Sequence, residues 1–248
     1  SHKMDEIYEL TDQITVLRDG QLIGSVATKD VTPDKLINMT VGRELKNVYV
    51  KTSEKTAQFD ENEILLQVDH LTRDKEFYDI SFQVKRGEIL GFFGLMGAGR
   101  TEVMDTVFGL RKADRGTVEM KGQKMGSIRK AIETGMAYIT EDRKLSGLNL
   151  IGSVKDNITI AYLDMVTKGK VVVDGKKEKA VCDELIEKLR IKCPGRDAMA
   201  GSLSGGNQQK IVIAKWFMGD PDLLIMDEPT RGIDIGAKAR FYRNHLLL

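Results

Sequence analysis

Apolar and polar positions form two separate patterns along the chain, one in the first 45 residues and one from residue 63 onward. In the first pattern, apolar runs at 14–18 and 22–26 flank an Asp-Gly dipeptide, which is typical of a hairpin turn. A helix is predicted before the hairpin, over 5–10. A second helix is predicted from Pro33, because proline suits the first helical position. The first pattern therefore predicts a helix, a hairpin and a helix.

Residues 46–62 separate the two patterns. This stretch is polar and rich in Lys, Glu and Thr, as linkers often are. Beyond it, apolar positions alternate over 64–68 and 80–84, which predicts an antiparallel pair of half-buried strands. We therefore place a domain boundary in the linker.

Three further runs, at 88–94, 135–139 and 223–226, are apolar almost throughout. Such runs are expected of strands that are covered on both faces. Residues 153–192 are highly charged and predict mostly helices. Strands that alternate with helices indicate an α/β fold, with a mostly parallel core sheet, an antiparallel β subdomain and an inserted helical subdomain.

Composition excludes some classes of function. The chain is 41% hydrophobic and 30% charged, as a soluble domain with a buried core would be. Its 38 basic and 37 acidic residues leave a net charge of +1, so we expect no nucleic-acid partner. No apolar run approaches the ~20 residues needed to cross a bilayer. Cys182 and Cys193, with no histidine between them, favour neither a metal site nor a disulfide.

A glycine-rich segment directly after the apolar run at 88–94 is the first candidate site. It reads Gly-Leu-Met-Gly-Ala-Gly-Arg-Thr, close to the phosphate-binding pattern G-x-x-x-x-G-K-[ST] between a strand and a helix. Glycines let backbone N–H groups surround phosphate oxygens, and the final hydroxyl is expected on Mg²⁺. Arginine stands where the pattern has lysine, with the same charge on a longer, planar group. The predicted nucleotide-binding residues are Gly94, Leu95, Met96, Gly97, Ala98, Gly99, Arg100 and Thr101.

Two carboxylates follow the apolar run at 223–226. A strand end can hold Asp227 rigidly enough to position Mg²⁺ together with Thr101. Glu228 is then placed to act as a general base toward an attacking water. We predict Thr101 and Asp227 as the metal ligands and Glu228 as the catalytic residue.

A third motif, Leu-Ser-Gly-Gly-Asn-Gln-Gln-Lys, precedes a predicted helix at 211–218. Ser204 can cap that helix, and the two glycines expose N–H groups at its positive end. This is a second phosphate-receptive surface, which one nucleotide does not need. It makes sense if two domains pair head to tail and each closes the site of the other. The predicted contacts are Ser204, Gly205, Gly206 and Gln208.

Together these motifs resemble those of the ABC ATPases. With the segments Tyr-Ile-Thr-Glu-Asp-Arg-Lys at 138–144 and Asp-Glu-Pro-Thr-Arg-Gly-Ile-Asp at 227–234, they resemble the second ATPase half of bacterial ribose-, galactose- and xylose-type importers. In that family one polypeptide holds two ATPase domains of the P-loop NTPase fold. The resemblance implies a nucleotide contact for Glu141 and an interface contact for Asp234.

The resemblance also divides the chain. Residues 1–45 resemble the tail of the first ATPase half, with His2 as its switch histidine. Residues 46–62 are the linker, and 63–248 are the second ATPase domain, incomplete at its C-terminus, with a helical subdomain at about 145–203. The residue that stacks on the adenine stays unassigned. His70, Phe77 and Tyr78 are nearest to the expected position, and Phe77 and Tyr78 are expected to pack in the core instead.

The resemblance implies an ATPase subunit that uses ATP and Mg²⁺ to drive monosaccharide import. Its partners would be the first ATPase half or a second copy, a membrane permease and, indirectly, a periplasmic sugar-binding protein. It would lie peripherally on the cytoplasmic face of the inner membrane. Residues 153–162 are predicted to dock the permease. Two alternatives are a catalytically degenerate half that completes the partner's ATP site and a non-transport ABC protein.

One prediction concerns packing between the two parts of the chain. Residues 5–26 resemble the ending of an ATPase domain, so they could cover an open edge of the 63–243 core. This predicts that Ile14, Val16 and Leu22 are buried against that core or against its copy in a neighbouring molecule.

Overall fold

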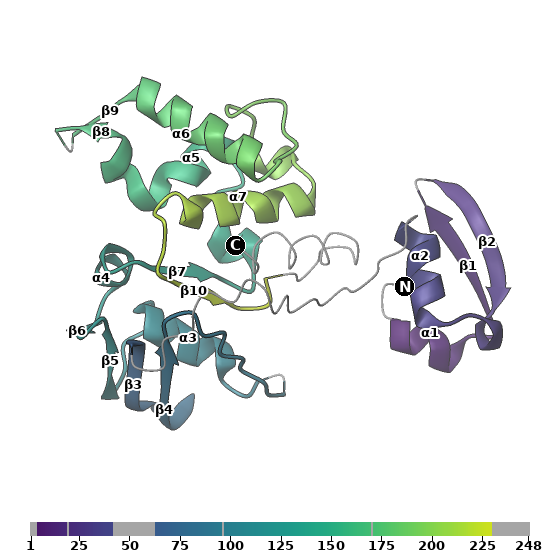
Figure 1. The fold of residues 1–248 in the computed structure, drawn as a ribbon, viewed down its shortest axis with the longest axis horizontal. Helices are drawn as coiled ribbons and strands as arrows, with labels where there is room; N and C mark the ends of the chain where they lie inside the picture. The colour runs from purple at the N-terminus through teal and green to yellow at the C-terminus, as the bar shows by residue number, and fades with distance from the viewer. Residues whose placement is uncertain (1–3, 19, 42–62, 96, 170, 230–248) are drawn as a thin grey trace. The chain divides into compact units, whose positions relative to one another are not determined.

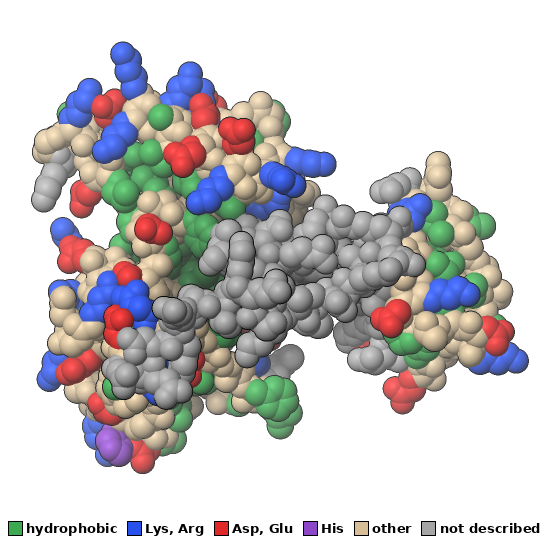
Figure 2. All heavy atoms as spheres, viewed as in Figure 1, with side chains coloured by type: hydrophobic (Ala, Val, Ile, Leu, Met, Phe, Trp, Pro, Cys, Tyr) green, Lys and Arg blue, Asp and Glu red, His purple; other side chains and the backbone are tan. Residues whose placement is uncertain are grey.

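The structure is a computed structural model that describes residues 4–18, 20–41, 63–95, 97–169 and 171–229. Its described residues fall into two compact units, an N-terminal one within 4–41 and a larger one within 63–229. Figure 1 shows the order of their elements. Charged side chains of both signs are interspersed on the visible faces in Figure 2, in keeping with the small net charge. No helix in the described ranges is both long enough and apolar enough to cross a membrane.

The N-terminal unit has its own hydrophobic core. It consists of α1 (Met4–Leu10), β1 (Gln13–Arg18), β2 (Gln21–Ala27), the 3₁₀ turn η1 (Thr28–Asp30) and α2 (Pro33–Val41), with β1 and β2 antiparallel. The predicted helix, hairpin and helix are confirmed. The core is formed by Ile14, Val16, Val31 and Leu36.

This core corrects part of the packing prediction. Ile14 and Val16 are buried within the N-terminal unit itself, against the side chains of its own helices. The pleat explains this burial: β1 turns one face toward α2, and Ile14 and Val16 lie on that face. Leu22 on β2 is 66% exposed within its own unit, so its burial against the larger unit or a neighbouring molecule stays a prediction.

The larger unit begins with a four-stranded antiparallel sheet. The strands are β3 (Ile64–Arg73), β4 (Phe77–Lys85), β5 (Arg115–Met120) and β6 (Gln123–Lys124), in the order β4-β3-β5-β6. Between β4 and β5 lies α3 (Arg100–Phe108), and α4 (Ile128–Glu133) follows β6. The predicted antiparallel pair is confirmed and is part of this sheet.

A parallel strand pair carries the candidate carboxylates. β7 (Met136–Ile139) pairs with β10 (Leu223–Met226) in the register Ile139↔Met226. All four side chains of β7 are buried. The parallel pair lies between α3 and the helical region in the ribbon of Figure 1. Because the strands are parallel, the residues after each of them meet at one edge of the sheet.

The residues between β7 and β10 are mostly helical, as predicted. They form the π turn η2 (Arg143–Gly147), α5 (Val154–Thr159), the 3₁₀ segment η3 (Ile160–Val166), α6 (Gly175–Lys188), the 3₁₀ turn η4 (Ala200–Ser202) and α7 (Gly205–Phe217). A small hairpin, β8 (Thr167–Lys168) with β9 (Val172–Val173), was not predicted. A two-residue strand is too short to give a period-2 pattern.

The predicted strand at 88–94 is wrong. This segment has no strand conformation in the structure, and Ile89 and Phe93 are 75% and 100% exposed. Phe92 contacts Phe82 edge-on, with 4.9 Å between ring centroids. An apolar run indicates a tendency to be buried, but a strand also needs a hydrogen-bonding neighbour. No strand of the described residues pairs with this one.

Candidate functional site

The phosphate-binding loop leads directly into α3. Gly99 lies at the N-cap of that helix with φ of 86°, a left-handed conformation that glycine adopts without strain. A Cβ at this position would also lie 3.2 Å from the Glu76 carbonyl oxygen. The glycine therefore lets the loop pass close to the β3–β4 turn. The N–H groups of the first turn of α3 have no partner within the helix and can bind an anion.

Thr101 and Asp227, which are far apart in the sequence, meet at this loop. The Thr101 hydroxyl donates to Asp227 Oδ2 at 2.6 Å. The Asp227 backbone N–H donates to the Ile139 carbonyl at 2.9 Å, which fixes the carboxylate at the end of the parallel pair. A hydroxyl and a carboxylate are the hard oxygen donors that Mg²⁺ takes in sites shared with a nucleotide. The residues therefore suit the predicted metal.

Glu228 lies beside Arg100. Arg100 Nη1 is 3.8 Å from Glu228 Oε1, and the glutamate side chain is 52% exposed. Its backbone has φ of 45°, which is uncommon for a residue other than glycine and often marks a functional site. The carboxylate can thus be reached by water, and the arginine lies within reach of the same space.

Glu141 belongs to the same edge of the sheet. It follows β7 by two residues, and β7 runs parallel to β10 with Ile139 opposite Met226. The parallel register brings the residues after β7 and those after β10 to one side. Side-chain contacts thus join the glycine-rich loop to Asp227 and Glu228, and the register puts Glu141 on the same edge of the sheet.

A partly buried polar network that the sequence did not reveal supports α3, the helix that follows the phosphate-binding loop. Tyr138 donates its hydroxyl to Asp105 Oδ1 at 3.0 Å, and Arg111 Nε donates to Asp105 Oδ2 at 2.9 Å. Arg111 also pairs with Glu76 at 3.1 Å. Burial and the Asp105 carboxylate raise the pKa of Tyr138, so its hydroxyl stays protonated as a donor. The network fixes α3 against β7 and the β3–β4 turn.

The third motif opens α7, as predicted, but its serine is used differently. Ser204 occupies the N-cap position, yet its side chain accepts no backbone hydrogen bond. Its hydroxyl accepts instead from Asn207 Nδ2 at 3.0 Å. The predicted cap is therefore wrong, because the nearby amide competes for the hydroxyl. Gly205 and Gly206 are partly exposed at the positive end of the helix.

In this structure the Gln208 side chain is hydrogen-bonded to the loop that precedes α7. Its side chain is 6% exposed, and its amide donates to the Leu203 carbonyl at 3.0 Å. It thereby holds the loop that leads into the motif.

The three candidates for base stacking are placed differently from one another. Phe77 is buried, as predicted. Tyr78 is 60% exposed, so its predicted core position is wrong: it lies on the open face of β4, where its hydroxyl accepts from the Lys75 N–H at 2.8 Å. His70 is exposed and pairs with Asp79 at 2.6 Å, and this hydrogen bond raises its pKa. Met96, Asp234 and His2 lie outside the described residues.

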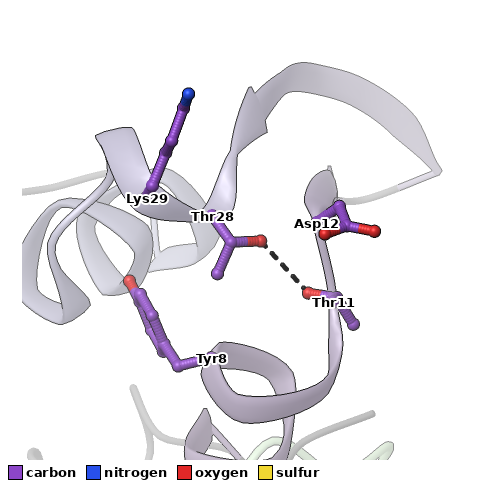
Figure 3. Close-up of a pocket in the computed structure, with 5 residues that line it drawn as sticks. All are labelled: Tyr8, Thr11, Asp12, Thr28 and Lys29. Carbon is purple, nitrogen blue, oxygen red and sulfur yellow. Dashed lines mark hydrogen bonds between the residues drawn. The ribbon is translucent and has the colours of Figure 1, made fainter.

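A hollow of about 330 Å³ in the N-terminal unit holds none of the predicted site residues. Figure 3 shows its lining, in which the hydroxyls of Thr11 and Thr28 lie 3.2 Å apart. The candidate site therefore belongs to the larger unit.

Comparison with known proteins shows the family to which the chain belongs. Residues 77–231 match the model of the ABC transporter family. The chain is 47% identical over its whole length to a protein of Geobacillus kaustophilus whose description as a ribose/galactose/methyl galactoside import ATP-binding protein is provisional. It is 44% identical, over 98% of its length, to the ribose import ATP-binding protein RbsA of Halalkalibacterium halodurans. It covers 48% of each of these proteins, so it spans about half their length.

Solved structures with the same fold are more distant in sequence. The ADP conformation of MJ1267, an ATP-binding cassette of an ABC transporter, has a TM-score of 0.59 and 20% identity. It matches 73% of this chain and 75% of that one. The dimeric cassette MJ0796 bound to ADP and Pi has a TM-score of 0.58 and 16% identity, over 73% of this chain and 84% of that one.

Proposed function

Since this chain belongs to the ABC transporter family, we propose that it is part of the ATP-binding subunit of a monosaccharide importer. In that role it binds ATP with Mg²⁺ and couples hydrolysis to transport through a membrane permease. The hydrogen bond of 2.6 Å between Thr101 and Asp227 carries the proposal. It joins the phosphate-binding loop to the carboxylate-bearing strand end, as a nucleotide–metal site requires.

Each residue at the site has a separate task. The N–H groups at the start of α3 bind phosphate oxygens, and Arg100 adds positive charge. Thr101 and Asp227 would hold Mg²⁺, which supplies charge neutralisation when bound. Glu228 orients a water and accepts its proton as the water oxygen attacks the γ-phosphorus. The bond between that phosphorus and the bridging oxygen breaks, and ADP leaves with the electron pair.

A second ATPase domain completes the arrangement. The exposed glycines at the start of α7 offer N–H groups to a phosphate, while the first phosphate site lies at α3. Head-to-tail pairing, with the other half of the polypeptide or a second copy, uses both. The relatives' names support ribose or galactose as the sugar class. Delivery by a periplasmic binding protein and a peripheral place on the cytoplasmic face of the inner membrane belong to the same proposal.

The helical region offers the surface for the permease. Ile151, just before the predicted docking segment, is 81% exposed. Within that segment, Lys155 pairs with Asp197 at 3.0 Å and Asp156 belongs to the capping box of α5. Changing Asp156 would also remove the capping box of α5, so Ile151→Asp is the better variant. It should lower sugar transport and leave nucleotide affinity unchanged; undiminished transport would place the docking surface elsewhere.

The test of this function uses the full-length protein with its permease in proteoliposomes. Glu228→Gln should lower ATP turnover and sugar uptake by roughly a hundredfold or more, because a general base contributes about that much, while ATP still binds. Glu133→Gln, an exposed glutamate of α4 paired with Arg129, is the matched control and should change neither. Unchanged turnover in Glu228→Gln would show that this half only completes the partner's site.

A further inference from the structure

One face of α7 packs directly on the π turn η2. Gln208, Val212 and Lys215 lie four and three residues apart, so they share that face. Arg143 Nε donates to Gln208 Oε1 at 3.5 Å. A Cβ at Gly147 would lie 3.3 Å from Val212 Cγ2, so the glycine permits the close approach.

Lys215 makes the third of these contacts, and it is the least expected. The residue is 8% exposed, and its Nζ donates to the Gly147 carbonyl at 2.8 Å. Among the described residues no charged group offsets its desolvation. Burial of an ammonium group without a counter-ion is costly, whereas methionine would fill a similar volume without charge. Stability alone is therefore a weak reason for a lysine here.

The turn η2, whose Gly147 carbonyl accepts from Lys215, follows directly after the loop that contains Glu141. The Glu141 loop, residues 140–142, connects β7 to the turn. At its start, the Ile139 carbonyl accepts from the Asp227 N–H at 2.9 Å. At its end, Asp142 Oδ1 caps the turn by accepting from the Lys144 N–H at 2.8 Å. π turns are rare and are often found at functional sites. A displacement of the Glu141 loop would thus move the carbonyl that Lys215 binds.

We propose that Lys215 is a positioning residue that ties α7, and the phosphate-receptive motif at its start, to the Glu141 loop. A change at the nucleotide site is then transmitted through the turn to the motif that serves the partner domain. This inference rests on the proposed function, because ATP is the ligand whose arrival is transmitted. Lys215 itself touches neither nucleotide nor metal in this account.

The chain contains a natural probe for this contact. Trp216 is its single tryptophan, and Lys215 Nζ lies 5.0 Å from the centroid of its ring. The same ring packs on Phe108, the last residue of α3, at 5.6 Å between centroids. Its fluorescence therefore reports on the junction between the phosphate-binding helix and α7.

The experiment compares the wild-type chain with Lys215→Met, Lys215→Arg and Lys210→Met. Lys210 is the matched control, because it lies on the same helix and donates to a different carbonyl, that of Arg190, at 2.6 Å. Calorimetric titration with Mg²⁺–ATP measures binding. Trp216 emission and hydrogen exchange of amides 140–150 and 205–218, with and without Mg²⁺–ATP, measure transmission.

In Lys215→Met we expect ATP affinity within about twofold of wild type and an unchanged or higher melting temperature. Amides 143–150 should exchange about five- to tenfold faster, the effect of losing one hydrogen bond. The ATP-induced changes in Trp216 emission and in the hydrogen exchange of amides 205–218 should disappear in Lys215→Met. They should remain in Lys210→Met and return in part in Lys215→Arg.

Three results would overturn the proposal. An ATP response of α7 in Lys215→Met equal to that of wild type would contradict the positioning role alone. A steep fall in melting temperature, with faster exchange throughout the unit, would show that Lys215 is structural. Absence of ATP binding by the wild-type chain would instead contradict the proposed function, and the positioning role with it.

Discussion

At the scale of single residues, the buried amine of Lys215 makes the stability of the larger unit depend on pH. Burial lowers its pKa from 10.5 to about 8. Between these two values the unfolded chain holds the proton and the folded chain does not, so the free energy of unfolding rises with pH in that window. Below pH 8 the destabilising contribution is fully present.

The prediction is a comparison of the wild-type chain with Lys215→Met by urea unfolding at pH 7.5 and pH 10. Wild type should gain up to roughly 3 kcal/mol relative to the variant, the free energy of a shift of this size. Both proteins share every other titrating group, so the difference isolates Lys215. Equal pH dependence in the two proteins would mean that the amine is not desolvated.

Single residues also show what sequence patterns can and cannot reveal about the site. The glycine-rich loop and the pair Thr101 and Asp227 were predicted, because each belongs to a short motif with its own chemical logic. The roles of Asp105 and Lys215 were not. Each lies on a helix where charged residues are common, and its partner, Tyr138 or Gly147, is distant in the sequence. Only the fold brings these partners together.

At the scale of elements, periodicity identified most helices and strands, but it predicted a strand at 88–94 that the structure does not have. The parallel pair and the antiparallel pair of β3 and β4 formed where predicted, since the alternating or continuous apolar runs there have neighbouring strands to pair with. The run at 88–94 is just as apolar but has no such neighbour among the described residues. Apolar patterning determines which segments favour burial, whereas hydrogen-bonding partners determine which of them become strands.

The end of α3 provides a test at this scale. Gly109 terminates the helix with φ of 86°, and a Cβ there would lie 2.7 Å from the Ser127 backbone. Gly109→Ala should therefore lower the free energy of unfolding by more than the ~1–2 kcal/mol that left-handed strain alone costs. Gly122→Ala is the control, since φ is 71° but nothing lies within 4 Å of the added methyl group. Equal losses in urea unfolding would show that the close contact does not matter.

At the scale of the whole molecule, the two units have different roles. The N-terminal unit closes its own core around Ile14 and Val16, so these two side chains do not need another domain to be buried. The larger unit carries every described residue of the candidate site. The polar stretch at 46–62 predicted a boundary between the two units, but it did not predict the separate N-terminal core. That core depends on α2 folding back on the hairpin, which motif comparison does not address.

We propose that this chain holds a Mg²⁺-dependent ATP site built on Thr101 and Asp227. Its most direct test is calorimetric titration of the purified chain with ATP, with and without Mg²⁺, alongside Thr101→Val. The control is Thr106→Val, an isosteric change on the same helix at a hydroxyl that only bonds the Glu102 carbonyl at 2.7 Å. We expect weak binding that Mg²⁺ strengthens in wild type and in Thr106→Val but not in Thr101→Val. Hydrolysis should stay well below ~1 s⁻¹, the low end of usual enzyme turnover, because the site is shared with a partner domain. Binding that is absent, or that is equally strengthened by Mg²⁺ in Thr101→Val, would contradict it.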